Sequence, residues 1–456
     1  MFRKKVSQKS YVTIVVFICL FLTPCTLHAY WPQLAKLTAS DGDPNDNFGC
    51  SVSTSGDYII VGACLDDEEG TDAGAAYIFK TDGTSWTQTA KLTASDAAAG
   101  HHFGNSVSID GFYAIVGSPH SDGNEPNTGA AYVFLRTFDY IPGQGFVEVW
   151  EEQAKLTSSD ARTGDEFGFS VSISKDWAIV GAPKPNSIRG SVYLYQRNET
   201  TWTQNSQFTQ PDDMLPIISN FGVSVSISGG YAVVGSSQWQ TTLIPPSTSG
   251  RAFFLKRKFK IVLPDDIIFY WEWDDNIGTV DGFGTSVSIN ADLAVVGSPG
   301  DRLEYPLVTL YFGAGHVYKY IASSWLEQGK LLLGGRTPAD KLGQSVCVFD
   351  DYAVVGAPGR DENGNNAGAA CIFRPVGTMW MEVARLLASD GAYEDGFGSS
   401  VAISADYVVV GAPGDDDNGT DSGSAYVFKV CPVADLNYDC STNFMDFSIF
   451  ADQWLQ

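Results

Sequence analysis

A sevenfold internal repeat constrains the fold of this chain more than any other feature of its sequence. Each copy is marked by a Phe-Gly pair, or by Leu-Gly in one case, and successive pairs are separated by 54 to 64 residues. A repeat of this period indicates small structural units that cannot bury their own apolar faces and must stack on one another. The seven pairs are Phe48-Gly49, Phe103-Gly104, Phe167-Gly168, Phe221-Gly222, Phe283-Gly284, Leu342-Gly343 and Phe397-Gly398.

Every copy carries the same four strand signals. The first, as in Ser170–Ser174, alternates between serine and apolar residues, which is typical of a strand crowded near an axis. The second is an apolar run ending in Gly-Ala-Pro, as in Tyr352–Pro358, and predicts a strand covered on both faces. The third resembles Gly129–Phe134 and the fourth resembles Trp86–Leu92. Each copy is therefore expected to form a four-stranded antiparallel sheet.

The two ends of the repeat region predict how the sheets are arranged. The seventh copy stops at Val430, before any Trp-led fourth strand, whereas Trp31–Leu37 is a fourth strand that precedes the first copy. We expect this orphan strand to complete the seventh sheet and close a ring. The sequence thus predicts an all-β, seven-bladed β-propeller over residues 30–430. Tandem β-sandwiches and an open solenoid are the alternatives, and the orphan strand argues against both.

The motifs resemble a known family. The pattern KLTASD, FG, SVSIS, VGAP and AYVF is similar to that of FG-GAP repeats, known from the integrin α-subunit head, and in particular to the bacterial FG-GAP group. The resemblance implies a seven-bladed propeller and, in integrin-type blades, Ca²⁺ in a loop between the first two strands. That junction is too short for such a loop here, as at Ser404–Tyr407. Acidic segments at Asp66–Asp72 and Asp415–Asp421 follow the Gly-Ala-Pro element instead, either as Ca²⁺ ligands or as solvated loops.

The N-terminal segment predicts export. Arg3, Lys4, Lys5 and Lys9 precede the apolar run Tyr11–Leu22, and Thr26–Ala29 supplies small residues for cleavage, so residues 1–29 are interpreted as a signal peptide. A lipoprotein acylated at Cys25 is the alternative. We expect a secreted or cell-surface protein without a transmembrane segment after cleavage. The net charge of −25, which cleavage would take to about −29, disfavours nucleic acid as a partner.

The last segment, residues 431–456, differs from the repeat and predicts a calcium loop followed by a short amphipathic helix. Oxygen-bearing residues stand at loop positions 1, 3, 5, 7, 9 and 12, the spacing by which one loop wraps Ca²⁺. This segment resembles half of a type I dockerin, which implies a cohesin-like docking partner. A terminal cap clamped by Cys431 and Cys440, without metal, is the alternative. The predicted ligands are Asp435, Asn437, Asp439, Ser441 through its carbonyl, Asn443 and Asp446.

The remaining cysteines and the irregular copies give further expectations. Cys50 and Cys64 are predicted to lie nearly opposite each other on paired strands, and Cys347 and Cys371 are predicted to be buried thiols. Copies two, four and five carry insertions. Thr137–Val147 and Arg302–Thr309 are expected to be loops. Lys256–Lys260, followed by the aromatic Ile261–Asp275, is either a ligand-binding rim or an enlarged outer strand.

No catalytic motif stands out from the repeat. His101 and His102 lie in a variable segment and are not supported as ligands, and we assign no catalytic residues and no cofactor besides Ca²⁺. The sequence therefore favours a monomeric binding or adhesion module that recognises an extracellular protein or glycan through a propeller face. A carbohydrate-active enzyme and a structural matrix protein are the alternatives.

Overall fold

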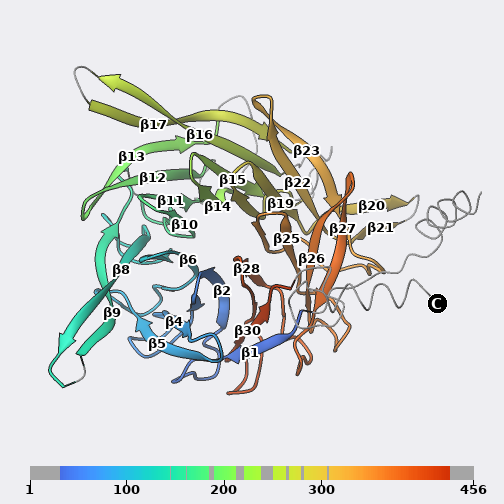
Figure 1. The fold of residues 1–456 in the computed structure, drawn as a ribbon, viewed down its shortest axis with the longest axis horizontal. Coiled ribbons are helices and arrows are strands. Elements are labelled where there is room, and N and C mark those ends of the chain that lie inside the picture. The colour runs from blue at the N-terminus through green and yellow to red at the C-terminus, as the bar shows by residue number, and fades with distance from the viewer. Residues whose placement is uncertain are drawn as a thin grey trace, which may run out of the picture. The chain divides into compact units, whose positions relative to one another are not determined.

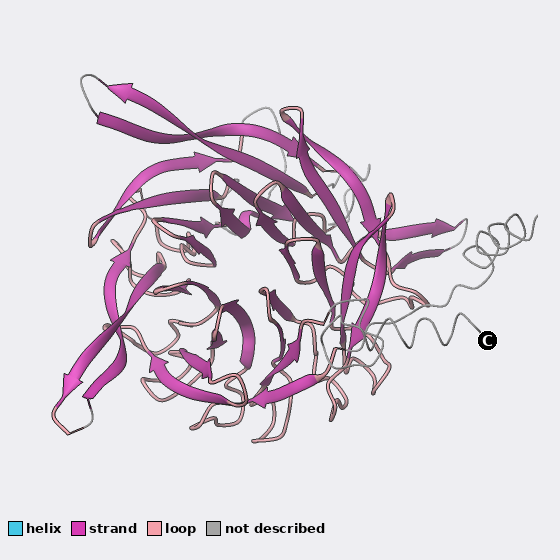
Figure 2. Ribbon diagram, viewed as in Figure 1, coloured by secondary structure: helices cyan, strands magenta, loops and turns pink. Residues whose placement is uncertain are grey.

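Seven four-stranded antiparallel sheets follow one another around a central axis (Figure 1). The computed structural model describes residues 31–143, 145–160, 162–183, 189–211, 220–237, 250–262, 266–278, 282–305 and 308–431. The described residues form β-strands joined by turns and loops (Figure 2). They contain no helix with the length and apolar character of a membrane span. Trp31–Cys431 is one unit, and the predicted β-propeller is confirmed.

Blades one to six run from an innermost strand to an outermost one in chain order, whereas blade seven takes its outermost strand from the start of the described chain. Blades one to three are β2 (Phe48–Ser55), β3 (Tyr58–Ala63), β4 (Ala75–Thr81) and β5 (Trp86–Leu92); β6 (Ser106–Asp110), β7 (Tyr113–Ser118), β8 (Ala130–Ile141) and β9 (Gly145–Leu156); and β10 (Ser170–Ser174), β11 (Trp177–Ala182), β12 (Ser191–Asn198) and β13 (Thr201–Thr209). Blades four and five are β14 (Asn220–Ser228), β15 (Tyr231–Ser237), β16 (Arg251–Val262) and β17 (Asp266–Ile277); and β18 (Ser286–Asn290), β19 (Leu293–Ser298), β22 (Ala314–Ile321) and β23 (Ser324–Leu331). Blade six is β24 (Val346–Phe349), β25 (Tyr352–Ala357), β26 (Ala369–Val376) and β27 (Met379–Leu386), and blade seven is β28 (Ser400–Ile403), β29 (Tyr407–Ala412), β30 (Ser424–Lys429) and β1 (Gln33–Leu37).

The first described strand closes the ring. β1 pairs antiparallel with β30, with Gln33 opposite Phe428 and Leu37 opposite Ala425, and so becomes the outermost strand of blade seven. In Figure 1 the blue β1 lies beside the red β30. Trp31 packs against Tyr352 of blade six, with ring centroids 5.5 Å apart. The predicted closure by Trp31–Leu37 is therefore confirmed.

Glycines set the distance between neighbouring blades. A Cβ atom on Gly411 of blade seven would lie 2.1 Å from the carbonyl oxygen of Gly49 in blade one. The same contact joins the glycine of the Gly-Ala-Pro element to the glycine of the next Phe-Gly pair at every interface. Any side chain larger than hydrogen would push the two backbones apart. The other six pairs are Gly62–Gly104, Gly117–Gly168, Gly181–Gly222, Gly235–Gly284, Gly297–Gly343 and Gly356–Gly398.

The serine alternation of the innermost strands also links the blades. The Ser53 hydroxyl accepts a hydrogen bond from the Ile109 backbone N–H of the next blade at 3.2 Å, and Ser172 accepts one from Ile227 in the same way. Apolar residues alternate with these serines and pack against the preceding blade, as Val52 does in one core cluster with Val409 of blade seven. Cys347 and Ala402 stand at the equivalent position in blades six and seven. The serine hydroxyls thus accept hydrogen bonds from backbone N–H groups of the next blade that have no partner within a sheet.

Aromatic residues fill the space between the sheets. Phe48 packs edge-on against Tyr77 and Phe79 of its own blade and belongs to a core cluster that includes Tyr407 of blade seven. A tryptophan in or next to the outermost strand leans on the second strand of the preceding blade, as Trp86 does on Tyr407 with ring centroids 5.0 Å apart. The core therefore lies between blades rather than within any one of them.

Two inserted segments differ from their expected structure. Thr137–Val147 was expected to be a loop, but its ends extend β8 and β9 into a long hairpin. Arg302–Thr309 was also expected to be a loop, but Arg302–Tyr305 and Val308–Tyr311 pair as the two-stranded hairpin β20–β21. In both cases β-branched and aromatic residues make cross-strand pairs, which stabilises strands where Gly and Pro suggest a loop.

The glycine contact gives a stability prediction. Gly411→Ala should lower the stability by about 3 kcal/mol, because its Cβ would collide with the backbone of blade one. The matched control is Gly230→Ala, since nothing lies within 4 Å of a Cβ there and its φ is not positive. The control should change the stability by less than about 0.5 kcal/mol. Urea unfolding measures both, and equal effects of the two substitutions would contradict the packing argument.

Candidate functional site

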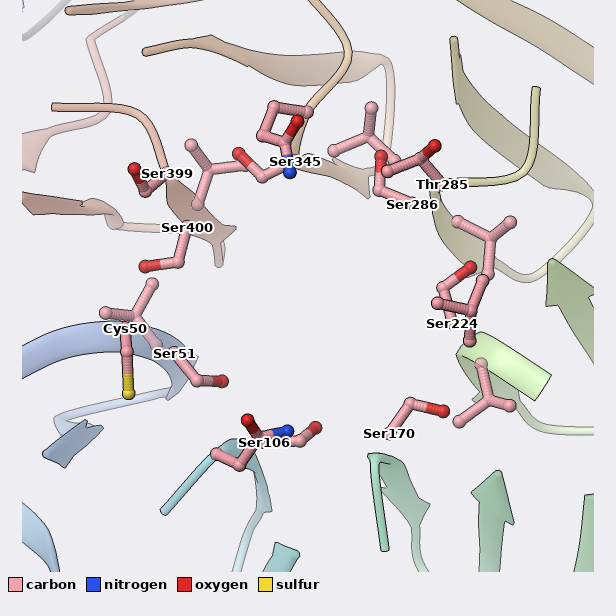
Figure 3. Close-up of a pocket in the computed structure, with 18 of the residues that line it drawn as sticks. Cys50, Ser51, Ser106, Ser170, Ser224, Thr285, Ser286, Ser345, Ser399 and Ser400 are labelled. Carbon is pink, nitrogen blue, oxygen red and sulfur yellow. The ribbon is translucent and has the colours of Figure 1, made fainter. Parts of the chain in front are cut away.

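One mouth of the central channel is a cavity of about 370 Å³ to which all seven blades contribute (Figure 3). The residue after each Phe-Gly pair differs from blade to blade, whereas the next residue is always serine. Five of these serines donate a hydrogen bond to the glycine carbonyl of the next blade, as Ser170 does to Gly222 at 2.8 Å. The other two accept one from the next blade, as Ser51 does from Val107. None of the described residues that line this mouth is charged, so its hydroxyl groups serve mainly to join blades.

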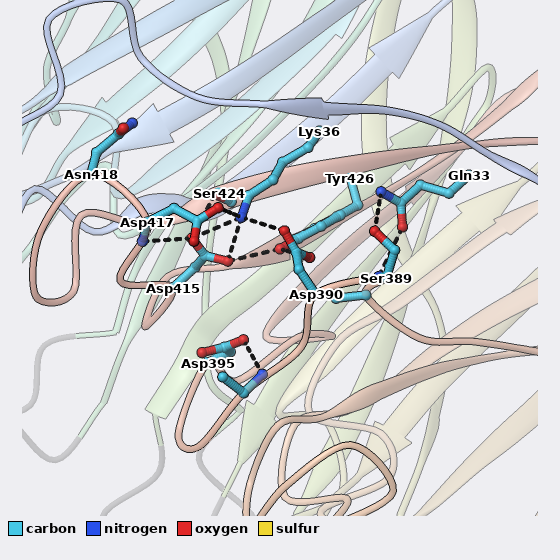
Figure 4. Close-up of polar contacts among 12 residues, drawn as sticks. Gln33, Lys36, Ser389, Asp390, Asp395, Asp415, Asp417, Asn418, Ser424 and Tyr426 are labelled. Carbon is cyan, nitrogen blue, oxygen red and sulfur yellow. Dashed lines mark hydrogen bonds and ion pairs between the residues drawn. The ribbon is translucent and has the colours of Figure 1, made fainter.

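Charged residues gather instead beneath the loops on this side of the propeller, and blade seven shows the arrangement best (Figure 4). Lys36 of β1 places its Nζ 2.8 Å from Asp390 and 2.9 Å from Asp415, and it also bonds Asp417. The Tyr426 hydroxyl donates to Asp415 at 2.7 Å. Burial of Lys36 favours the neutral amine, but its hydrogen bonds to the three carboxylates outweigh burial and raise its pKa.

This cluster is also the best candidate for a metal site among the described residues. Carboxylate oxygens of Asp390, Asp415 and Asp417 all lie within 4.8 Å of one another. The Lys36 ammonium group already bonds all three side chains and lies above the Tyr426 ring. The carboxylates therefore converge on a cation that belongs to the chain itself.

The same cluster recurs around the ring. In blade one, Lys91 bonds Asp41, Asp66 and Glu68, and the Tyr77 hydroxyl donates to Asp66 at 2.6 Å. In blades two and three the tyrosine bonds the aspartate of the TASD motif, through Tyr132–Asp96 and Tyr193–Asp160, as Tyr426 also does with Asp390 in blade seven. Blades five and six have His316 and Cys371 in place of the tyrosine. The Lys of KL, the Tyr of AYVF and the Asp of TASD are thus parts of one repeated structural unit.

The two acidic segments considered as calcium ligands have local roles as well. Asp66 and Asp415 face these clusters, whereas Asp67 accepts a hydrogen bond from the Asp72 backbone N–H at 2.7 Å. Asp416 accepts the equivalent bond from Asp421 at 2.8 Å. These carboxylates therefore hold the shape of the loops that carry them.

Buried aspartates precede two of the Phe-Gly pairs in this acidic region. Asp46 accepts a hydrogen bond from the Asp43 backbone N–H at 2.7 Å, and Asp395 does the same with Ala392. Burial is the largest cause that raises the pKa of Asp46 to about 6; the hydrogen bond from the Asp43 N–H opposes this rise, and the nearby charge of Asp66 adds to it. Burial raises the pKa of Asp395 in the same way, with Asp415 adding to it.

Three histidines lie together in blade two. The rings of His102 and His120 have centroids 4.7 Å apart, and the His101 Nδ1 is buried without a hydrogen-bond partner among the described residues. Burial lowers the pKa of His120, as do His102 and His101. His101 and His102 both precede the strand β6, and His102 has a φ of 55°. His120 is 18 residues away and no sequence signal linked it to them.

Two hairpins project from the outer rim of the ring (Figure 1). The strands β8, β9, β16 and β17 have 12 residues each, against 7 for β4 and β5. Both hairpins also contact neighbouring blades. The Tyr58 hydroxyl of blade one donates to Glu148 at 2.7 Å, and Trp271 packs against Trp177 of blade three.

The far ends of these hairpins expose aromatic side chains. In β8–β9, Phe138, Tyr140 and Phe146 are 52%, 66% and 76% exposed, and they share one face because Tyr140 is paired with Phe146 and Phe138 with Glu148. In β16–β17, Phe259 is 62% exposed. The β8–β9 hairpin thus presents three exposed aromatic side chains on one face.

The basic segment Lys256–Lys260 lies on the long strand β16, the third strand of blade four. The Lys256 Nζ bonds the Tyr320 hydroxyl at 2.7 Å, Arg257 lies over Trp177, and Lys258 pairs with Glu272 at 2.6 Å. These three cations are therefore engaged within the propeller.

The described residues include four cysteines with free thiols and a fifth that is disulfide-bonded. Cys50, Cys64, Cys347 and Cys371 are free thiols, of which Cys371 is buried and the other three are half-buried. Cys431 is disulfide-bonded, and its predicted partner Cys440 lies outside the described residues. The predicted calcium ligands also lie outside the described residues: Asp435, Asn437, Asp439, Ser441, Asn443 and Asp446.

Comparison with known proteins identifies the family. A sequence model of the FG-GAP repeat matches more than half of the chain, so this protein belongs to the FG-GAP repeat family. Blade four and most of blade five fall outside the matched segments, yet they have the same four-stranded design. A propeller of this family is a protein-interaction module in general. The matched residues are 31–79, 86–134, 150–195, 325–373 and 380–428.

Solved structures show more distant similarities. The Pan2 WD40 domain of Neurospora crassa is 10% identical, with a TM-score of 0.47, over 88% of this chain and 96% of that one. A Lactobacillus plantarum protein from a structural genomics consortium is 12% identical, with a TM-score of 0.43, over 78% of this chain and 89% of that one. No curated protein matches the chain significantly. The fold described here rests on the strand pairing rather than on these similarities.

The raised pKa of Asp46 gives a pH prediction. Because the folded protein holds this proton more tightly than the unfolded chain, Asp46 costs stability as the pH rises from about 4 to about 6. Asp46→Asn keeps an oxygen acceptor for the Asp43 N–H and removes the charge. Calorimetry should give this variant a higher melting temperature than the wild type at pH 7.5 and the same melting temperature at pH 4.

Asp395→Asn is the matched replicate and should behave in the same way. If Asp46→Asn had a lower melting temperature than the wild type at pH 7.5, the conclusion that the Asp46 charge lowers the stability of the fold would be contradicted.

Proposed function

We propose that this chain is an exported module that recognises a protein partner through the aromatic ends of its β8–β9 and β16–β17 hairpins. The observation that carries the proposal is the exposed trio Phe138, Tyr140 and Phe146 on a hairpin that contacts blade one. Side chains of this size lose little entropy on binding when their backbone is already fixed, and aromatic residues dominate binding energy at interfaces.

The geometry of the trio favours a protein over a glycan. The rings of Tyr140 and Phe146 meet edge to face, with centroids 5.5 Å apart and planes inclined by 66°. Such a pair forms a ridge that fits an apolar pocket, whereas stacking of a sugar ring needs a flat aromatic platform. Protein recognition is therefore the function that this surface supports best.

Binding rather than catalysis is also supported by how the charged residues are used. The lysines and carboxylates beneath the loops bond one another, as Lys36 and Lys91 do with three carboxylates each. Side chains committed in this way are poorly placed to exchange protons with a substrate. The net charge of −25 further favours a partner that is not a nucleic acid.

Export and calcium-dependent attachment complete the proposal. The basic and apolar segments of residues 1–29 support export to a secreted or cell-surface location. The ligand spacing from Asp435 to Asp446 supports a Ca²⁺ loop that would serve in docking or surface retention.

The hairpin surface is tested by substituting its three aromatics together. A partner is first identified by cross-linking and mass spectrometry of the exported fraction, and its affinity is then measured by interferometry with purified proteins. Phe138→Ser, Tyr140→Ser and Phe146→Ser combined should weaken binding at least about 30-fold, which corresponds to about 2 kcal/mol.

The matched control is Tyr393→Ser. Tyr393 is an aromatic residue of similar exposure, but it lies in the loop between β27 and β28 and not on either hairpin. The control should bind as the wild type does. Unchanged binding by the triple variant would overturn the assignment of this surface. Binding to a glycan array that depends on the trio would replace the protein partner with a glycan.

The tail is tested by calorimetric titration of Ca²⁺ into the full exported chain and into a variant that ends at Val430. The described propeller is complete without the tail, since blade seven takes its last strand from β1. The full chain should bind one more Ca²⁺ ion than the truncated variant. Equal uptake by both would refute the calcium loop.

A further inference from the structure

Blade one differs from the other six at two positions of the repeat at once. Cys50 follows its Phe-Gly pair, and Cys64 follows its Gly-Ala pair, where the other copies have proline or serine. No other copy has a cysteine at either position. The equivalent pairs are Asn105 and Pro119, Phe169 and Pro183, Val223 and Ser237, Thr285 and Pro299, Gln344 and Pro358, and Ser399 and Pro413.

The fold places the two cysteines side by side. In the pairing of β2 with β3, Phe48 lies opposite Ala63 and Ser51 opposite Gly62, so Cys50 belongs to a bulge, and Cys64 follows Ala63 directly. Because Cys64 directly follows the residue opposite Phe48, the strand register brings it next to the bulge that carries Cys50. The Cys50 Sγ also lies 3.4 Å from the Gly62 carbonyl oxygen. Both residues are half-buried free thiols.

Both thiols are partly exposed, and Cys50 is next to the central channel. Cys50 lines the cavity at the channel mouth, where its sulfur is visible in Figure 3. Cys347 and Cys371 offer a contrast within the same molecule, because they lie on β24 and β26 with β25 between them. The geometry for a bond between neighbouring thiols is thus particular to blade one among the described residues.

We propose that Cys50 and Cys64 are a redox-active pair that closes to a disulfide when the protein meets a small-molecule disulfide. The Cys64 thiolate attacks one sulfur of the reagent, which breaks its S–S bond and releases one thiol. The Cys50 thiolate then attacks the Cys64 sulfur of the mixed disulfide and releases the second thiol. Two protein thiols are oxidised, one reagent disulfide is reduced, and both protons pass to the released thiols.

The order of attack follows from the chemistry of the pair. The hydrogen bond from Cys50 lowers the pKa of Cys64 despite its burial, and the same hydrogen bond, together with burial, raises the pKa of Cys50. The thiolate is the nucleophile in disulfide exchange, so Cys64 reacts first and Cys50 resolves the intermediate.

The bond would lie at the interface that closes the ring. Gly49, next to Cys50, contacts Gly411 of blade seven, and its carbonyl oxygen accepts a hydrogen bond from Ser400 at 2.8 Å. The disulfide would tie this bulge to the loop after β3 within blade one. Because the cross-link constrains the unfolded chain around a short loop, the oxidised protein should be the more stable form.

The test compares the full chain after treatment with oxidised glutathione and after reduction with dithiothreitol. In the oxidised sample, non-reduced peptide mapping should find Cys50 joined to Cys64, with a mass about 2 Da below that of the two free peptides. Neither thiol should then react with an alkylating reagent, and the melting temperature should exceed that of the reduced sample.

Cys50→Ser and Cys64→Ser are matched variants, because Ser399 and Ser237 occupy the same positions in blades seven and four. Each should lose the redox dependence of the melting temperature and retain the fold, whereas Cys347→Ser should keep it. Full alkylation of Cys50 and Cys64 after oxidation, or glutathione adducts that never resolve, would overturn the proposal.

Discussion

The close contact between two backbones, made at every junction by one glycine from each blade, is the constraint on which the rest of the structure depends. It holds neighbouring sheets near enough for the serine hydroxyls of one innermost strand to reach the backbone of the next. It also leaves a fixed gap farther out, which Phe48 and its equivalents fill. The Phe-Gly and Gly-Ala-Pro motifs are therefore two halves of one interface rather than two independent signatures.

A second constraint is electrostatic. A chain with a net charge of −25 brings many carboxylates together beneath its loops, and their repulsion would open the loops if nothing balanced it. Lys36 and Lys91 supply that balance from the outermost strands. In blade seven the lysine comes from β1, so the strand that closes the ring also supplies a cation to the cluster of Asp390, Asp415 and Asp417.

Most of the fold could be predicted from the sequence, because each strand is fixed by a local pattern that recurs seven times. Ser170–Ser174 and Trp86–Leu92 coincide with β10 and β5. Prediction failed where a segment departs from the repeat: the Gly and Pro of Thr137–Val147 suggested a loop, but cross-strand pairs extend the hairpin there. The His102–His120 contact joins distant residues, so no local pattern encodes it. Function is less predictable, since the exposed aromatics follow no repeat.

The central claim, a ring closed by its first strand, is tested most directly by native-state hydrogen exchange. β1 makes its strand hydrogen bonds with β30, so its amides are protected only if the ring is closed. The account predicts that backbone amides of Gln33–Leu37 exchange as slowly as those of β5, the outermost strand of blade one. Exchange of Gln33–Leu37 at the rate of an unstructured peptide, with β5 still protected, would contradict it.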